Sequence, residues 1–127
     1  MARIPAKRWR TRADVLYLLA RAKAEIDSRV CDGPSLRQIA QSIGLSPFHF
    51  QKLFRRLYRE SPHEYLTRSR LAIAKELIED GEMTVSQACA EVGFRSLASF
   101  SRLFRKHHGI APGELRRRPA IPPRESS

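Results

Sequence analysis

The sequence predicts an all-α protein of seven helices. Three observations lead to this fold class. Apolar residues recur at spacings of three and four through most of the chain, no segment alternates as a strand does, and serine or threonine precedes most of the apolar runs, as helix N-caps do. With 127 residues, 42% of them hydrophobic, the chain suffices for one compact body or two small lobes.

Three helices are predicted in the first half of the chain. An apolar stripe indicates a first helix over residues 13–29, and its members are Val15, Leu18, Leu19, Ala22 and Ile26. Ser35 is placed to cap a second helix that ends at Ser42. Ser46, followed directly by a proline, is placed to cap a third helix over residues 46–59.

A long fourth helix is predicted over residues 62–80. Ser61 and Pro62 repeat the pattern of a cap followed by proline, and Gly81 ends the helix. Its expected buried side includes Tyr65, Leu66, Ser69, Ile73, Leu77 and their neighbours.

Three shorter helices complete the predicted fold. Thr84 caps a fifth helix that runs through Val92, and Ser96 caps a sixth over residues 96–108. A seventh follows over residues 111–118, where alanine and proline open the helix and three arginines end it.

The two halves of the chain repeat each other. At an offset of 50 residues the matched pairs are Phe50 and Phe100, Leu53 and Leu103, Phe54 and Phe104, Arg55 and Arg105, Pro62 and Pro112, and Glu64 and Glu114. Upstream, an offset of 49 pairs Ala40 with Cys89 and Gly44 with Gly93. In each copy the glycine follows the small residue by four positions and is free to take a positive φ in a tight turn, which is the layout of a helix-turn-helix unit.

Two copies fall short of the three or so repeats that a solenoid needs, so a duplicated module is predicted: two tandem helix-turn-helix subdomains joined by a long linker helix. The expected segments are a basic N-terminal arm (1–12), the first subdomain (13–61), the linker helix (62–80), the second subdomain (81–118) and a flexible tail (119–127).

The charge of the chain predicts a polyanionic partner. The formal net charge is +11 at pH 7. Charge alone leaves nucleic acid, an anionic membrane and an acidic protein open, and the duplicated helix-turn-helix pattern favours double-stranded DNA. No apolar stretch approaches the ~18 residues of a spanning helix, and the basic N-terminus has no signal-like apolar core. A cytoplasmic protein without a membrane partner is therefore expected.

Burial of the apolar residues fixes which side of each recognition helix faces outward. The third helix is expected to bury Phe50, Leu53, Phe54 and Leu57. At 100° per residue its opposite side carries Phe48, Lys52, Arg55 and Arg59, flanked by His49, Gln51 and Arg56. The sixth helix is expected to bury Phe100, Leu103 and Phe104 and to expose Ala98, Arg102 and Arg105, with Arg95 and Ser99 near its start.

Residues near the start of a recognition helix contact base edges, and later ones contact phosphates. The predicted base contacts are Ser46, Phe48, His49, Gln51, Lys52, Arg95, Ala98, Ser99 and Arg102. Arg102 suits the O6 and N7 atoms of guanine, and Phe48 suits a thymine methyl group unless it packs against the first helix. The predicted phosphate contacts are Ser35, Arg55, Arg56, Thr84, Arg105 and Lys106, where Ser35 and Thr84 mark helix starts with backbone N–H groups.

Residues 13–117 resemble the DNA-binding region of the AraC/XylS regulators, in particular the small members built from two modules. The motif that carries the resemblance comprises Gly93, Phe94, Ser99, Phe100, Arg102, Phe104, Arg105, Lys106, Gly109, Pro112 and Arg116, matched upstream by Arg70, Ala74 and Leu77. The resemblance implies a monomeric transcription regulator whose third and sixth helices enter successive major grooves, and an activator that meets RNA polymerase. The chain departs from the family pattern at Arg59, where glycine is usual, and at Leu115, where an aromatic residue is usual.

Nothing in the sequence indicates catalysis, a cofactor or a metal. Cys31 and Cys89 form no CxxC pair and are expected to be reduced thiols, with Cys89 packed at the small buried position of its copy. His107 and His108 point about 100° apart on a helix, so phosphate contact or solvation is expected in place of metal binding. No nucleophile and base can be paired, so the chain is not expected to be an enzyme.

Two other kinds of protein fit the same sequence less well. One is a sequence-tolerant architectural protein that coats or bends DNA through the same basic surface. The other is a helical adaptor for an acidic protein surface, for which the duplicated recognition helix would have no use.

Overall fold

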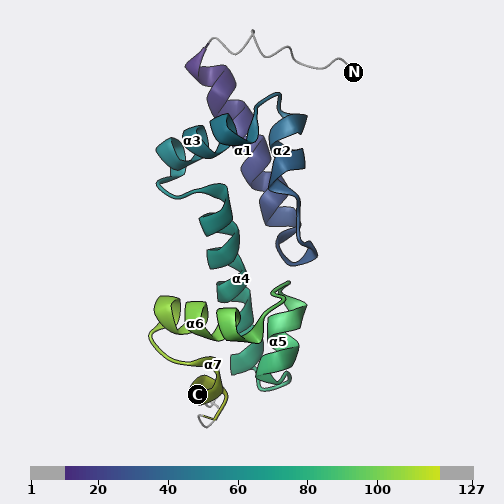
Figure 1. Ribbon diagram of the computed structural model, residues 1–127, viewed down its shortest axis with the longest axis vertical. Coiled ribbons are helices and arrows are strands. Elements are labelled where there is room, and N and C mark those ends of the chain that lie inside the picture. The colour runs from purple at the N-terminus through teal and green to yellow at the C-terminus, as the bar shows by residue number, and fades with distance from the viewer. Residues whose placement is uncertain (1–10, 118–127) are drawn as a thin grey trace, which may run out of the picture. The chain divides into compact units, whose positions relative to one another are not determined.

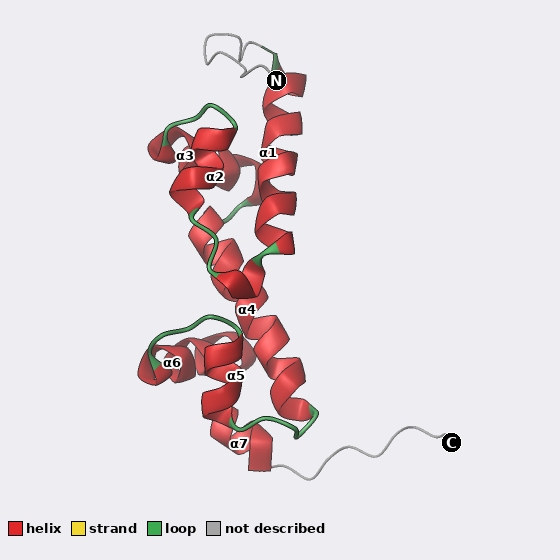
Figure 2. Ribbon diagram, turned by 90° about the vertical axis from the view of Figure 1, so that its right-hand side faces the viewer, coloured by secondary structure: helices red, strands yellow, loops and turns green. Residues whose placement is uncertain are grey.

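The computed structural model describes residues 11–117, so most of the predicted arm and the whole of the predicted tail lie outside the described residues. Within this range every regular element is a helix, as the sequence predicts (Figures 1 and 2). The elements are α1 (Arg12–Ser28), the 3₁₀ turn η2 (Val30–Asp32), α2 (Leu36–Ser42), α3 (Pro47–Tyr58), α4 (Pro62–Glu79), α5 (Val85–Glu91), α6 (Leu97–His108) and α7 (Pro112–Arg117).

Side-chain caps start the helices close to where the sequence predicts. The hydroxyls of Ser35, Ser46, Thr84 and Ser96 each accept a hydrogen bond from the backbone amide three residues on. Thr11, which the apolar pattern did not single out, caps α1 in the same way by accepting from the amide of Asp14 at 3.0 Å. The short turn η2 was not predicted, because three residues are too few to show a helical period.

The chain divides into two compact units, and their boundary lies between Thr67 and Arg68, inside α4. In the first unit α1, α2 and α3 pack together around buried aliphatic residues and two aromatic rings. The buried residues of these helices are Leu18, Leu19, Ala22, Ile26, Ile39, Ala40, Phe50 and Phe54. The rings of Phe54 and Tyr58 lie 4.6 Å apart, and those of Phe54 and Tyr65 lie 5.9 Å apart.

Three expectations for this core are wrong. Leu57 was expected inside but is 38% exposed, and Leu53 is only half-buried. Val15 is likewise half-buried on α1. The reason is that an open groove lies between α1 and α3, and these side chains form its walls instead of closing over it.

A polar cluster ties the start of α4 to α1 in the first unit. The hydroxyl of Tyr65 donates to the carboxylate of Asp27, and the ammonium group of Lys23 lies 3.5 Å from that carboxylate and 4.9 Å from the centre of the Tyr65 ring. Partial burial raises the pKa of Tyr65 above its usual value. Tyr65 was expected to be buried, but it is half-buried because its hydroxyl reaches this partner at the surface.

The second unit is built on the rest of α4, with α5, α6 and α7 packed together. Its buried residues include Leu71, Ala74, Ile78, Ala88, Cys89, Val92, Phe100, Phe104, Pro112 and Leu115. Ser69, Ile73 and Leu77 were expected on the buried side of α4 but are half-buried. The buried and the half-buried residues of α4 both recur at helical spacings. The sequence pattern therefore did not show which of the two sets faces the core.

None of the helices within residues 11–117 is both long enough and apolar enough to cross a membrane.

Candidate nucleic-acid interface

Each unit contains a tight turn between two helices, built around one glycine. Gly44 and Gly93 have φ values of 79° and 96°, which confirms the predicted left-handed turn. In the first turn the amide of Leu45 donates to the carbonyl oxygen of Ala40 at 2.9 Å, and in the second the amide of Phe94 donates to that of Cys89 at 3.0 Å. The two turns therefore share one backbone arrangement, and the extra residue of the second copy follows it.

The position of Cys89 in this turn is buried, as predicted. Its Sγ atom lies 3.9 Å from the carbonyl oxygen of Phe94 and 4.0 Å from that of Ser96. Burial raises the pKa of the Cys89 thiol, which keeps it protonated and poorly nucleophilic.

The start of α3 presents polar and aromatic side chains to solvent. Phe48 is 75% exposed, so the alternative that it packs against α1 is excluded. The other exposed residues of the predicted base-contacting set in this unit are Ser46, His49, Gln51 and Lys52. The hydroxyl of Ser46 accepts from the amide of His49 at 3.1 Å, and this cap fixes the first turn of the helix.

The start of α6 presents the corresponding side in the second unit. Arg95, Ala98 and Arg102 are exposed, and Ser99 is half-buried. The amide of Ser99 donates to the Ser96 hydroxyl at 3.1 Å, so its backbone serves the cap. At an offset of 50 residues, Ala98 corresponds to Phe48 and Arg102 to Lys52.

The electrostatics of both helices favour an anion. Neither α3 nor α6 contains an aspartate or a glutamate, and each carries basic residues in its last turn. The four predicted phosphate contacts on these helices, Arg55, Arg56, Arg105 and Lys106, are all exposed.

One of these cations has a partner that sequence reasoning missed. The Nη2 atom of Arg55 lies 3.1 Å from Oε1 of Glu64. The same oxygen accepts from the amide of Ser61 at 2.9 Å, and the Ser61 hydroxyl accepts from the Glu64 amide at 3.1 Å. The hydrogen bond from the Ser61 amide, with the charge of Arg55, lowers the pKa of Glu64. The signal for this pair was the recurrence of both residues at the 50-residue offset.

At the starts of α2 and α5, the side chains of Ser35 and Thr84 accept hydrogen bonds from amides of their own helices. Ser35 accepts from the amide of Gln38 at 3.2 Å, and Thr84 accepts from the amide of Gln87 at 3.1 Å. The amide of Thr84 is itself bound to the side-chain oxygen of Gln87 at 2.8 Å. The predicted phosphate contact at this helix start therefore depends on the amides that follow Thr84.

The two histidines of α6 differ in their surroundings. His107 is exposed, but His108 is half-buried, with its ring centre 4.5 Å from that of Phe104 and its Nε2 atom 3.0 Å from the carbonyl oxygen of Leu71. The expectation of phosphate contact or solvation is therefore wrong for His108. Its counterpart at an offset of 50 residues is Tyr58, whose ring packs on Phe54 in the same way, and that correspondence was the available signal.

The ends of α3 and α6 also correspond. Arg59 follows α3 with a φ of 67°, and Gly109 follows α6 with a φ of 74°. Arg59 therefore adopts the left-handed conformation that glycine has in the second unit.

Within the part of the chain that the structure describes, no three His, Cys, Asp or Glu side chains come together as a metal site would require.

Comparisons with known proteins agree on one kind of fold. A family model described as a helix-turn-helix domain matches residues 39–118. The transcriptional activator RhrA of Rhizobium meliloti (strain 1021) is 34% identical over 102 residues, which cover 78% of this chain and 32% of RhrA. The chain spans about a third of the length of most of the curated relatives that it matches.

Two solved structures are similar to this chain over most of their length. A probable AraC family transcriptional regulator from Rhodopseudomonas palustris CGA009 is 28% identical, with a TM-score of 0.76, over 84% of this chain and 99% of that one. The DNA-binding domain of AdpA, a global transcriptional factor solved in complex with a target DNA, is 26% identical, with a TM-score of 0.71, over 77% of this chain and 88% of that one.

Proposed function

The chain belongs to the AraC-type family of helix-turn-helix proteins, and on this premise we propose that it is a sequence-specific double-stranded DNA-binding transcription regulator. In this proposal α3 and α6 enter adjacent major grooves of one duplex. The observation that supports it most strongly is the repeated outward surface: two capped helices without acidic residues expose matching side chains at an offset of 50 residues.

The role proposed for each exposed residue follows from its position along the helix. Residues in the first two turns of each helix reach base edges, with Arg102 donating to the O6 and N7 atoms of guanine and Phe48 contacting a thymine methyl group. Lys52 is the counterpart of Arg102 on α3. Cations near the helix ends, such as Arg56 and Lys106, bind phosphates and fix the position of the protein on the duplex without reading sequence.

A single chain supplies two recognition helices, so one copy suffices for a site of about two helical turns. We propose that the protein binds as a monomer to an asymmetric site. Sedimentation of a complex with labelled duplex tests this point: a one-to-one complex is expected, and a two-to-one complex at a single site contradicts it.

Activation of transcription is a second part of the proposal, and it rests on the family and on the similarity to RhrA, a transcriptional activator. An activator that meets RNA polymerase raises transcript yield from a promoter that carries its site. A purified transcription reaction with and without the protein measures this effect, and a fall in yield would indicate a repressor.

Selection of bound sites from random duplex DNA tests the DNA-binding proposal itself. The selection is run near physiological salt, because phosphate-driven affinity falls steeply as salt rises. Two short enriched blocks with centres roughly 10 base pairs apart are expected. If binding is retained but no sequence is enriched, the net charge of +11 is acting without base recognition, and the architectural function replaces the proposed one.

A further inference from the structure

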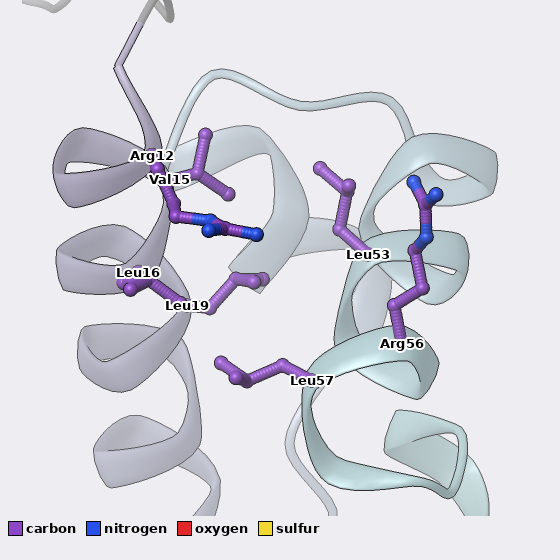
Figure 3. Close-up of a pocket in the computed structure, with 7 residues that line it drawn as sticks. All are labelled: Arg12, Val15, Leu16, Leu19, Leu53, Arg56 and Leu57. Atoms are coloured by element: carbon purple, nitrogen blue, oxygen red, sulfur yellow. The ribbon is translucent and has the colours of Figure 1, made fainter.

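An open groove lies between α1 and α3 in the first unit (Figure 3). Five aliphatic residues and two arginines line it: Arg12, Val15, Leu16, Leu19, Leu53, Arg56 and Leu57. Its volume is about 610 Å³, within the range of roughly 300 to 1,000 Å³ that is usual for binding pockets. Aliphatic side chains from α1 and α3 face one another across the groove (Figure 3).

The apolar surface of this groove is not required by the repeated fold. Leu16 is 41% exposed and Leu57 is 38% exposed. Aligning the buried residues of α1 with those of α4 at an offset of 52 places Arg68 where α1 has Leu16, and the 50-residue offset places His107 where α3 has Leu57. The second unit thus has the same kind of core with polar residues at both positions, so the exposed leucines are particular to the first unit.

The charges of the groove are of one sign and come from both walls. Arg12 extends from α1 and Arg56 from α3, and no carboxylate lines the groove (Figure 3). Among the residues that the structure describes, neither guanidinium forms an ion pair. An occupant that complements this surface carries a row of apolar groups with acidic groups on either side of it.

Charge also argues against the occupants that this chain itself offers. Residues 1–10 contain four basic side chains and no acidic one, and residues 118–127 contain two basic side chains and one acidic one. A second copy of the chain would bring a net charge of +11 to a groove that already holds two guanidinium groups. The matching occupant is therefore an acidic segment that differs from both of these segments and from a second copy with this net charge.

We propose that the groove binds an acidic amphipathic helix of a partner protein. The lining of α1 runs from Arg12 to Leu19, a separation of seven residues or about 10 Å at 1.5 Å per residue, which matches two turns of a bound helix with anchors at positions i, i+3 or i+4, and i+7. Aspartate or glutamate beside those anchors pairs with Arg12 and with Arg56.

This partner site lies on a different side of α3 from the predicted base contacts. Leu57 and Phe48 are nine residues apart, which is two and a half helical turns, so they point in opposite directions. The proposal goes beyond the proposed function and shares only Arg56 with its phosphate contacts, so a variant that loses base recognition keeps the groove.

Display selection of a random helical peptide library on the intact protein tests the proposal. The Leu16→Gln/Leu57→Gln double variant serves for counter-selection, because both side chains are exposed and their loss leaves the core in place. The expected peptides are enriched on the wild type only and carry leucine, isoleucine or phenylalanine at the three anchor positions with acidic residues beside them.

Charge reversal then checks the orientation of an enriched peptide. Arg12→Glu is expected to weaken binding roughly tenfold, and a peptide with lysine in place of its acidic residues is expected to recover affinity for that variant. Tyr17→Gln is the matched control, since Tyr17 is 63% exposed on the same helix but does not line the groove, and it should leave peptide binding unchanged.

Three outcomes would overturn the proposal. One is the absence of any peptide that prefers the wild type, or the enrichment of peptides without acidic residues. Another is a shift of the Leu16 and Leu57 methyl signals on addition of dodecanoate when no peptide is enriched, which would assign the groove to a small amphiphile. The third is a dimer in sedimentation that the double variant dissociates, which would assign it to a second copy.

Discussion

His108 donates a hydrogen bond from Nε2 to the carbonyl oxygen of Leu71, at 3.0 Å. The direction is fixed because a carbonyl oxygen can only accept, so Nε2 carries the proton of this hydrogen bond. The contact joins the end of α6 to α4 within the second unit, and the ring also packs on Phe104. One side chain thus holds the recognition helix of this unit to the helix beneath it.

Loss of this side chain should destabilise the second unit. His108→Ala removes both the hydrogen bond and the ring contact, so we expect the free energy of unfolding to fall by about 2 kcal/mol. His107→Ala is the matched control, because His107 is exposed, and a change within about 0.5 kcal/mol is expected. Urea denaturation measures both variants, and equal losses would contradict this role of His108.

Glycine in place of Arg59 should stabilise the first unit. Arg59 holds a φ of 67°, a conformation that costs a residue with a Cβ atom roughly 1 to 2 kcal/mol. Part of that gain is offset by the greater freedom of glycine in the unfolded chain, so Arg59→Gly is expected to raise the free energy of unfolding by roughly 0.5 to 1 kcal/mol.

The reverse substitution in the second unit is the control. Gly109 has a φ of 74°, and a Cβ atom added there would meet nothing within 4 Å, so Gly109→Ala tests backbone strain without a steric clash. It is expected to destabilise by about 1 kcal/mol. Thermal unfolding of both variants checks the pair, and an Arg59→Gly variant that melts below the wild type would show that the left-handed conformation is not strained.

Acid should weaken the first unit through Glu64. The pKa of Glu64 is lowered in the folded protein, chiefly by the hydrogen bond from the Ser61 amide. A lowered folded pKa gives stability that is complete above the unfolded pKa of about 4.3 and is lost as the pH falls through the folded pKa. The difference in urea midpoint between wild type and Glu64→Gln should therefore shrink from pH 6 to pH 3. A difference that stays constant over this range would contradict the assignment.

The sequence predicted the helices well because their signals are local. Serine and threonine caps fixed the helix starts, as at Ser46, and the repeated glycines fixed both turns. What it missed depends on contacts between elements. Whether Leu57 closes the core or lines a groove depends on the distance between α1 and α3. The apolar pattern within α3 gives no information on that distance.

The candidate site divides in the same way. The outward positions of Phe48 and Arg102 follow from the helical period, and both side chains are exposed as expected. The roles of His108 and Glu64 depend on partners in other helices. The duplication held a signal for both. Glu64 recurs as Glu114, and His108 corresponds to Tyr58, whose ring packs on Phe54.

Phe48 should recognise thymine by its methyl group. Its ring is 75% exposed on a polar surface, so Phe48→Ala is expected to change the free energy of unfolding by less than about 0.5 kcal/mol. On DNA, replacing thymine with deoxyuridine removes only the methyl group. The wild type should bind the deoxyuridine duplex about fivefold more weakly, and Phe48→Ala should bind both duplexes alike. A fluorescence titration that finds the same preference in both proteins would exclude this contact.

The central claim is that two recognition helices read two separate segments of one duplex, and site selection repeated with Lys52→Ala and with Arg102→Ala tests it most directly. Each truncation removes one base-reading side chain, at a cost of roughly 1 to 3 kcal/mol confined to the base pairs that it contacts. The account predicts that each variant loses sequence preference in its own block and keeps it in the other. A uniform loss of affinity across all sequences for both variants would contradict it.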